Sequence, residues 1–113
     1  MDKLMNYQNY IKQILNEYER ISAQVAEPDV DEVLMFDDER KQYLWFNIGW
    51  KQGKRVKGIS VYIRIKNDKI YIEEDWTEEG IATELMRKGV PSSDIVLAFQ
   101  PPDVRKFTDF ATV

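Results

Sequence analysis

The sequence contains no cysteine and no histidine among its 113 residues. These absences exclude disulfides, thiol nucleophiles, imidazole bases and zinc sites of the usual nitrogen or sulfur type from this chain. Catalysis by the chain alone would have to use carboxylate, lysine, tyrosine or serine side chains. We therefore expect a protein that is not an enzyme, with no catalytic residues, no metal and no cofactor.

Long apolar runs are also absent, since even Ile95–Phe99 holds only five apolar residues. A membrane-spanning helix needs about 20 such residues, and the first residues of the chain lack the apolar core of a secretory signal. These features predict a cytoplasmic protein without membrane contact. With 43% hydrophobic and 32% charged residues, we expect one globular domain spanning residues 1–113.

The charges are segregated along the chain. The net charge is −4 and the sequence pI is about 4.9, yet residues 51–69 carry seven basic side chains and one acidic side chain. Within this basic hairpin, Lys54, Arg55, Lys57 and Arg64 are candidates for contacts with DNA phosphates. Because the net charge opposes general nucleic-acid binding, a DNA-binding module is an alternative hypothesis here.

The periodicity of apolar residues predicts an α+β fold. Apolar residues at three- and four-residue spacing from Leu4 to Val25 predict a helix of roughly 20 residues whose stripe packs on a sheet. The same spacing leaves open a homodimer paired through this helix. Alternating patterns predict an antiparallel meander, with strands at residues 32–36, 42–50, 59–66 and 69–75. A buried strand at residues 95–99 and two shorter helices, at residues 77–88 and from Pro102 onward, complete a mainly antiparallel sheet of four to five strands.

Alternation also predicts which side chains face outward. It places Leu44, Phe46 and Ile48 on one side of their strand, and we expect Ile59 to face the core together with Val61 and Ile63. The outward face would then hold an aromatic group that is a candidate protein interface: Tyr43, Trp45, Tyr62 and Tyr71. Base stacking by these aromatics, or ordinary cross-strand pairing, are the alternatives.

The C-terminal Pro101–Pro102 pair with Arg105 is either a rigid corner or a docking edge, and these three residues are further interface candidates. We expect the flanking Phe99, Val104 and Phe107 to be buried.

Two carboxylate clusters occur, at residues 37–39 and at residues 73–79. A carboxylate-metal enzyme using Glu73, Asp75 and Glu78 is a third hypothesis. Neither cluster contains a glycine-centred calcium loop, so solvated turns and charged helix ends are the simpler interpretation of both.

Several segments carry a resemblance to a known family: residues 10–18, 42–44, 49–50, 52–58, 77–78, 80–82, 84–85, 89–91 and 94–99, followed by Pro101, Pro102 and Arg105. In this order they resemble the fdxN element excision controlling factor family, known as XisI. Gln100 stands where many members of that family have histidine, so a histidine-based site would be absent from this chain.

The resemblance implies a cyanobacterial accessory protein associated with developmentally regulated, site-specific excision of the fdxN DNA element during heterocyst differentiation. In that family a separate recombinase cuts the DNA, and the controlling factor is paired with XisH, a protein that looks like a nuclease. We therefore expect a non-catalytic controlling factor that acts through protein–protein binding to an XisH-type partner. A homodimer and direct nucleic-acid binding remain open.

Overall fold

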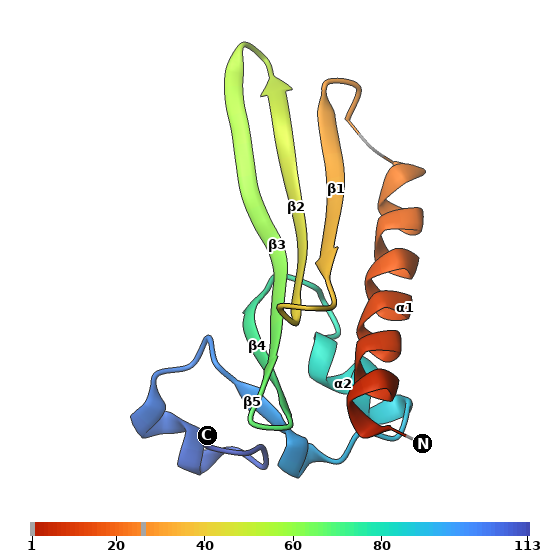
Figure 1. The fold of residues 1–113 in the computed structure, drawn as a ribbon. Helices are drawn as coiled ribbons and strands as arrows, with labels where there is room; N and C mark the ends of the chain where they lie inside the picture. The colour runs from red at the N-terminus through yellow and green to blue at the C-terminus, as the bar shows by residue number, and fades with distance from the viewer. Residues whose placement is uncertain (1, 26) are drawn as a thin grey trace.

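In the computed structural model, which describes residues 2–25 and 27–113, two helices lie on one face of a mixed sheet (Figure 1). Helix α1, Lys3–Ala23, packs on strands β1 and β2, and helix α2, Ile81–Arg87, packs on β4 and α1. The strands are β1 Val30–Asp37, β2 Gln42–Lys51, β3 Lys54–Lys66, β4 Lys69–Asp75 and β5 Ile95–Leu97, with the 3₁₀ helices η1 Ser92–Asp94 and η2 Pro102–Phe107.

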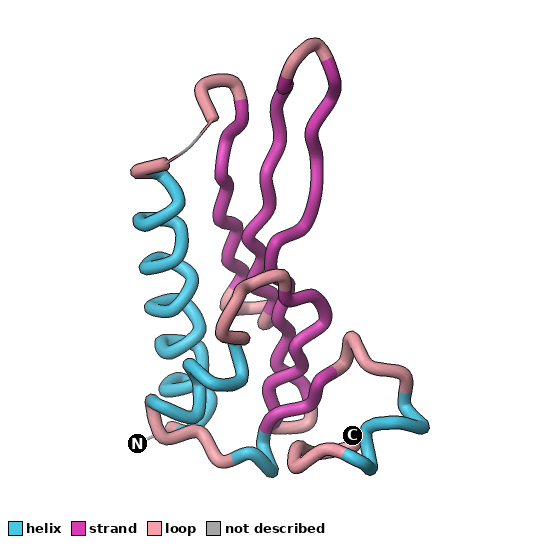
Figure 2. The backbone as a smooth tube through the Cα atoms, turned by 180° about the vertical axis from the view of Figure 1, so that it is seen from behind, coloured by secondary structure: helices cyan, strands magenta, loops and turns pink. Residues whose placement is uncertain are grey.

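The sheet has the strand order β1-β2-β3-β4-β5. Strands β1 to β4 pair antiparallel, and β5 joins β4 in parallel after the crossover through α2. The predicted α+β fold with a mainly antiparallel sheet is therefore confirmed. Seen from behind, β2 and β3 extend as a hairpin beyond β4 (Figure 2).

Tight turns fix the register of this meander. Asn67 and Asp68 both have positive φ, at 54° and 61°, as a two-residue hairpin turn requires. Gln52 and Gly53, which form the tip of the β2–β3 hairpin, also have positive φ, at 52° and 76°. Lys51 consequently lies opposite Lys54.

The core lies between α1 and the sheet. The predicted apolar stripe of α1 supplies Tyr7, Ile11, Ile14 and Leu15, all buried, and Ile21 near its end is exposed. Packing of this helix on the sheet is therefore confirmed, and its stripe is largely used by the core. No helix in the described parts of the chain is both long and apolar enough to cross a membrane.

Helix α2 begins later than predicted, at Ile81 instead of Thr77. The carboxylate of Asp75 explains the delay, because it accepts hydrogen bonds from the backbone N–H of Thr77 at 2.9 Å and of Ile81 at 2.7 Å. The intervening residues therefore form a capped loop. At the other end Gly89 has φ of 99°, and the N–H of Val90 donates to the Leu85 carbonyl, so the helix ends in the left-handed stop that glycine favours.

A β-bulge changes the orientation of one half of β3. The register with β2 shifts between Trp45 and Phe46, so that Trp45 lies opposite Val61 while Phe46 lies opposite Ile59. The extra residue, Ser60, reverses the alternation of side chains along β3. Val61 and Ile63 face the core as predicted, but the prediction that Ile59 does so is wrong, because its side chain is 44% exposed.

Candidate protein-binding surfaces

Two of the four predicted interface aromatics belong to the core. Tyr43 is fully buried and Trp45 is 7% exposed, so the prediction that they lie on an exposed face with Tyr62 is wrong. Tyr43 donates its hydroxyl hydrogen bond to Asp38 at 2.8 Å. Burial, together with this hydrogen bond, raises the pKa of Tyr43.

Trp45 is held by partners on two elements. Its ring stacks on Tyr18 of α1 with centroids 5.9 Å apart, and its Nε1 donates to Glu32 at 3.1 Å. A buried aromatic side chain with a polar atom needs such a partner. Both aromatics can therefore face α1, and the aliphatic side of β2 is turned outward instead.

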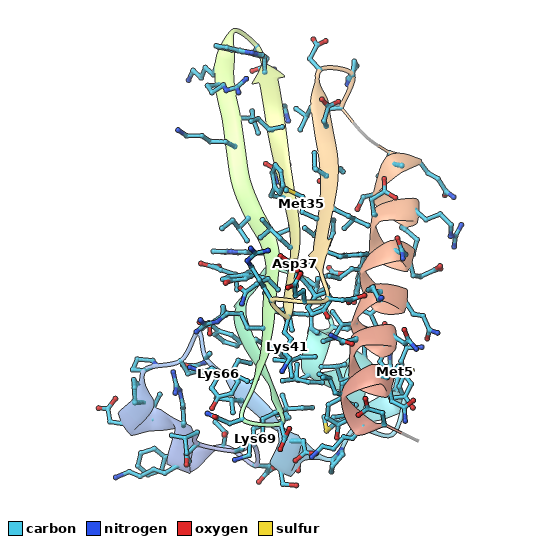
Figure 3. All side chains as sticks on the ribbon, viewed as in Figure 1. Met5, Met35, Asp37, Lys41, Lys66 and Lys69 are labelled. Atoms are coloured by element: carbon cyan, nitrogen blue, oxygen red, sulfur yellow. The ribbon has the colours of Figure 1, made fainter. Side chains whose placement is uncertain are left out.

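The outward side of strands β1 to β3 is an apolar surface that no helix of residues 2–25 and 27–113 covers. We call it the open face, and its residues are Met35, Leu44, Phe46, Ile48, Ile59 and Tyr62. Met35 is 58% exposed. It lies on β1 two residues before Asp37, and Figure 3 labels both residues. The hollow around Met35, Leu44 and Tyr62 has a volume of about 600 Å³. Such a surface is typical of a contact with another protein chain.

The other two predicted aromatics have different surroundings. Tyr62 is half-buried at the edge of the open face and donates its hydroxyl to Gln42. Tyr71 is 5% exposed, so its predicted exposure is wrong. It lies opposite Val96 of β5, and Ala111 returns beside Val96, so the end of the chain runs along the outer edge of β5.

Sequence reasoning missed Met35, Leu44, Phe46, Ile48 and Ile59 as surface residues. Strand β2 carries large apolar side chains on both sides, so alternation alone could not decide which side is buried. The two-residue turn at Gln52–Gly53 predicts a register in which Tyr43 lies opposite Tyr62. The bulge at Ser60 places Ile63 opposite Tyr43 instead, and no signal in the sequence marks that bulge.

The C-terminal segment forms a second surface, which we call the C-terminal platform and define as residues 98–113. Arg105 holds it together by donating to the carbonyl oxygens of Gln100 at 3.0 Å, Ala98 at 3.1 Å and Thr112 at 3.4 Å. Pro101 and Pro102 are exposed on it. Arg105 thus makes a rigid corner of this segment.

The apolar side chains of the platform are not buried as predicted. Phe99, Val104 and Phe107 are exposed, and Phe107 is 79% exposed. Val104 and Phe107 are three residues apart on the 3₁₀ helix η2, so they lie on the same side of it. All three side chains therefore lie at the surface of the platform.

The structure divides the predicted DNA-contacting residues. Lys54, Arg55 and Lys57 are exposed near the tip of the β2–β3 hairpin. Arg64 lies near the other end of β3, where its Nε and Nη2 donate to Glu73 at 3.0 and 2.8 Å. The four residues therefore do not form one basic patch.

The carboxylate clusters are used by the fold. Glu73 holds Arg64, and Asp75 accepts the hydrogen bonds at the start of α2. Hydrogen bonds from Lys12 and then from Tyr43 hold the pKa of Asp38 below its usual range. Among residues 2–25 and 27–113, no group of three acidic side chains is arranged to hold a metal ion.

Comparison with known proteins identifies the family. The sequence profile of the XisI protein family matches residues 1–112. The chain belongs to the XisI family. No curated protein sequence matches it.

Two solved XisI structures have the same fold. An XisI-like protein from Anabaena variabilis is 36% identical, with a TM-score of 0.90 over 97% of this chain and 99% of that one. The fdxN element excision controlling factor XisI from the same organism is 41% identical, with a TM-score of 0.86 over 99% of this chain and 100% of that one. The resemblance seen in the sequence is thus confirmed.

Proposed function

We propose that this XisI-family protein is a non-catalytic controlling factor for the excision of a DNA element. The observation that carries the proposal is its 41% identity, over 99% of this chain and 100% of the other, to a protein described as the fdxN element excision controlling factor. The residues agree with a role other than catalysis. The chain has no histidine or cysteine, and Glu73 and Asp75, two of the three carboxylates considered for a metal enzyme, have structural partners.

The partner we propose is a nuclease-like protein of the XisH type, which docks on the C-terminal platform. The platform offers exposed apolar side chains at Val104 and Phe107 on a segment that Arg105 already holds rigid. Rigid exposed apolar groups lose little conformational entropy on binding. Pro101 and Pro102 restrict the backbone further.

Charge supports the same kind of partner. The net charge of −4 would favour association with a basic surface, such as the DNA-binding groove of a nuclease. If this attraction contributes, the affinity for the partner falls as the salt concentration rises. An affinity that is unchanged by salt would contradict the charge contribution and leave only the apolar contact.

The test is co-expression with an XisH-type nuclease-like protein, followed by size-exclusion chromatography with light scattering. We expect a stable stoichiometric complex that is lost or strongly weakened in Phe107→Glu, because this change places a charge in an apolar contact. Met5→Glu is the matched control, since Met5 is an exposed apolar residue at the start of α1, outside the platform. Absence of a complex would contradict the proposal, and so would equal binding of the partner by Phe107→Glu and Met5→Glu.

The second candidate function is direct DNA binding through the hairpin tip. It is favoured by one observation, the exposure of Lys54, Arg55 and Lys57 on a hairpin that extends beyond the rest of the sheet (Figure 1). Fluorescence anisotropy with duplex DNA at several salt concentrations tests it. DNA binding through the tip requires a steep salt dependence and a large loss when these three residues become glutamate, whereas Arg64→Gln should have little effect.

A further inference from the structure

The open face is flanked by charges of opposite sign. The register places residues of β1, β2 and β3 in four rows across this face: Asp31–Ile48–Lys57, Val33–Phe46–Ile59, Met35–Leu44–Tyr62 and Asp37–Gln42–Arg64. The side chains of the two inner rows are apolar except for the hydroxyl of Tyr62. Each outer row has an acid on β1 and a base on β3.

We propose that the open face binds a second copy of this chain, with a two-fold axis parallel to β2. Such an axis places β1 of one copy over β3 of the other. Asp31 then meets the partner copy's Lys57, and Asp37 meets its Arg64, while Met35, Leu44 and Phe46 are covered in the middle. An isologous interface makes every such contact twice.

The charge pattern disfavours a face-to-face arrangement about a perpendicular axis. A two-fold axis perpendicular to the strands would place β1 over β1 and β3 over β3. Asp31 would then face Asp37 of the second copy, and Lys57 would face its Arg64. Like charges placed opposite one another across an interface oppose association, so of these two axes the one parallel to β2 makes this surface complementary to itself.

The pair of Asp31 and Lys57 gives the clearest test of the proposed dimer contact. Arg40 holds Asp37 at 3.0 Å, and Glu73 holds Arg64 at 2.8 Å. Within the described residues, Asp31 and Lys57 make no ion pair. In a single chain they are separated by β2, two strand spacings or about 10 Å, so attraction between them is mainly a property of the dimer.

The experiment is sedimentation velocity over a wide concentration range, extended to the solubility limit because three strands form a small interface. We expect a reversible dimer. Asp31→Lys and Lys57→Asp should each weaken it by about tenfold or more, since each reversal replaces two symmetric attractions by repulsions. Mixing the two variants should produce a heterodimer, and the double variant should again form a homodimer.

Two further variants separate the contact from general effects of charge and folding. Met35→Glu places a charge in the centre of the face at a position that is already 58% exposed, so the protein should fold but remain monomeric. Asp103→Lys has the same charge change as Asp31→Lys on the exposed C-terminal platform, and it should leave the dimer unchanged. A wild-type monomer at every concentration would overturn the proposal, and so would a dimer that is indifferent to Met35→Glu and to both charge reversals.

Discussion

The hydroxyl of Tyr7 in α1 donates a hydrogen bond of 2.5 Å to Asp94, which lies 87 positions further along the chain. Lys3 approaches the same carboxylate at 3.0 Å. Burial by itself would raise the pKa of Asp94, but the hydrogen bonds from Tyr7 and Lys3 outweigh it and hold this pKa below its usual range. Burial and the same hydrogen bond raise the pKa of Tyr7. The start of α1 is thereby tied to the turn that precedes β5.

Removing this hydroxyl should make the protein less stable near neutral pH. We expect Tyr7→Phe to lower the free energy of unfolding by about 1.5–3 kcal/mol, the usual range for a hydrogen bond to a charged group. A carboxylate with a lowered pKa contributes stability above its unfolded pKa, and that stability is lost as the pH falls through the folded pKa. The difference between wild type and variant should therefore shrink in acid.

Urea unfolding at a series of pH values measures this difference. Tyr10→Phe is the matched control, because Tyr10 lies on the same helix and its hydroxyl makes no hydrogen bond within the described residues. A difference that stays constant from neutral to strongly acid pH would show that the Tyr7–Asp94 pair does not act through the ionised carboxylate.

The two tryptophans of β2 should respond very differently to truncation. Trp45 is 7% exposed and stacks on Tyr18, whereas Trp50 is 54% exposed near the hairpin tip. We expect Trp45→Ala to lower the free energy of unfolding by about 3–5 kcal/mol through the cavity it leaves. Trp50→Ala should cost less than about 1 kcal/mol. Equal losses in denaturant unfolding would contradict the orientation of β2.

A glycine marks the close approach of β1 and β2. A Cβ atom at Gly49 would lie 2.0 Å from the Asp29 carbonyl oxygen and 2.6 Å from the Val30 Cα. Gly49→Ala must therefore move backbone, and we expect a loss of about 2–4 kcal/mol. Gly58→Ala is the control, since the nearest atom to its Cβ is Asn47 Oδ1 at 3.6 Å. Thermal unfolding should separate the two variants clearly, and similar midpoints would contradict this close approach.

Arg105 should govern the order of the C-terminal platform. Arg105→Met removes three hydrogen bonds to backbone carbonyls, and Lys106→Met changes the same charge at an exposed neighbour. Hydrogen exchange of the Ala111 amide, which donates to the Ile95 carbonyl, should become faster by about tenfold or more only in the Arg105 variant. Unchanged exchange there would mean that the platform is held by packing alone.

Much of the fold could be predicted from local signals in the sequence. The spacing of Tyr7, Ile11 and Ile14 identified the helix face that is buried. Asn67, Asp68 and Gly89 have positive φ, and Asn, Asp and Gly are the residue types that tolerate this conformation. These features depend on a few neighbouring residues, so sequence alone suffices for them.

The candidate surfaces depend on events that leave no local signal. One extra residue at Ser60 turns Ile59 from the core to the surface. Tyr43 and Trp45 can be buried because their polar atoms find partners outside their own strand. Tyr43 donates to Asp38, and Trp45 donates to Glu32. Phe107 is exposed, although its apolar side chain and the strand before it suggested burial.

The order of the strands in the sheet has a consequence for how the chain folds. Every strand pairs with the strand that precedes or follows it in the sequence, and two of the connections are two-residue turns. Closing such short loops costs little entropy, so the sheet can grow from a single hairpin by adding neighbours. The contact between Tyr7 and Asp94 spans most of the chain. Its closure costs more entropy, and we expect the docking of α1 at that end to be the late, slow event in folding.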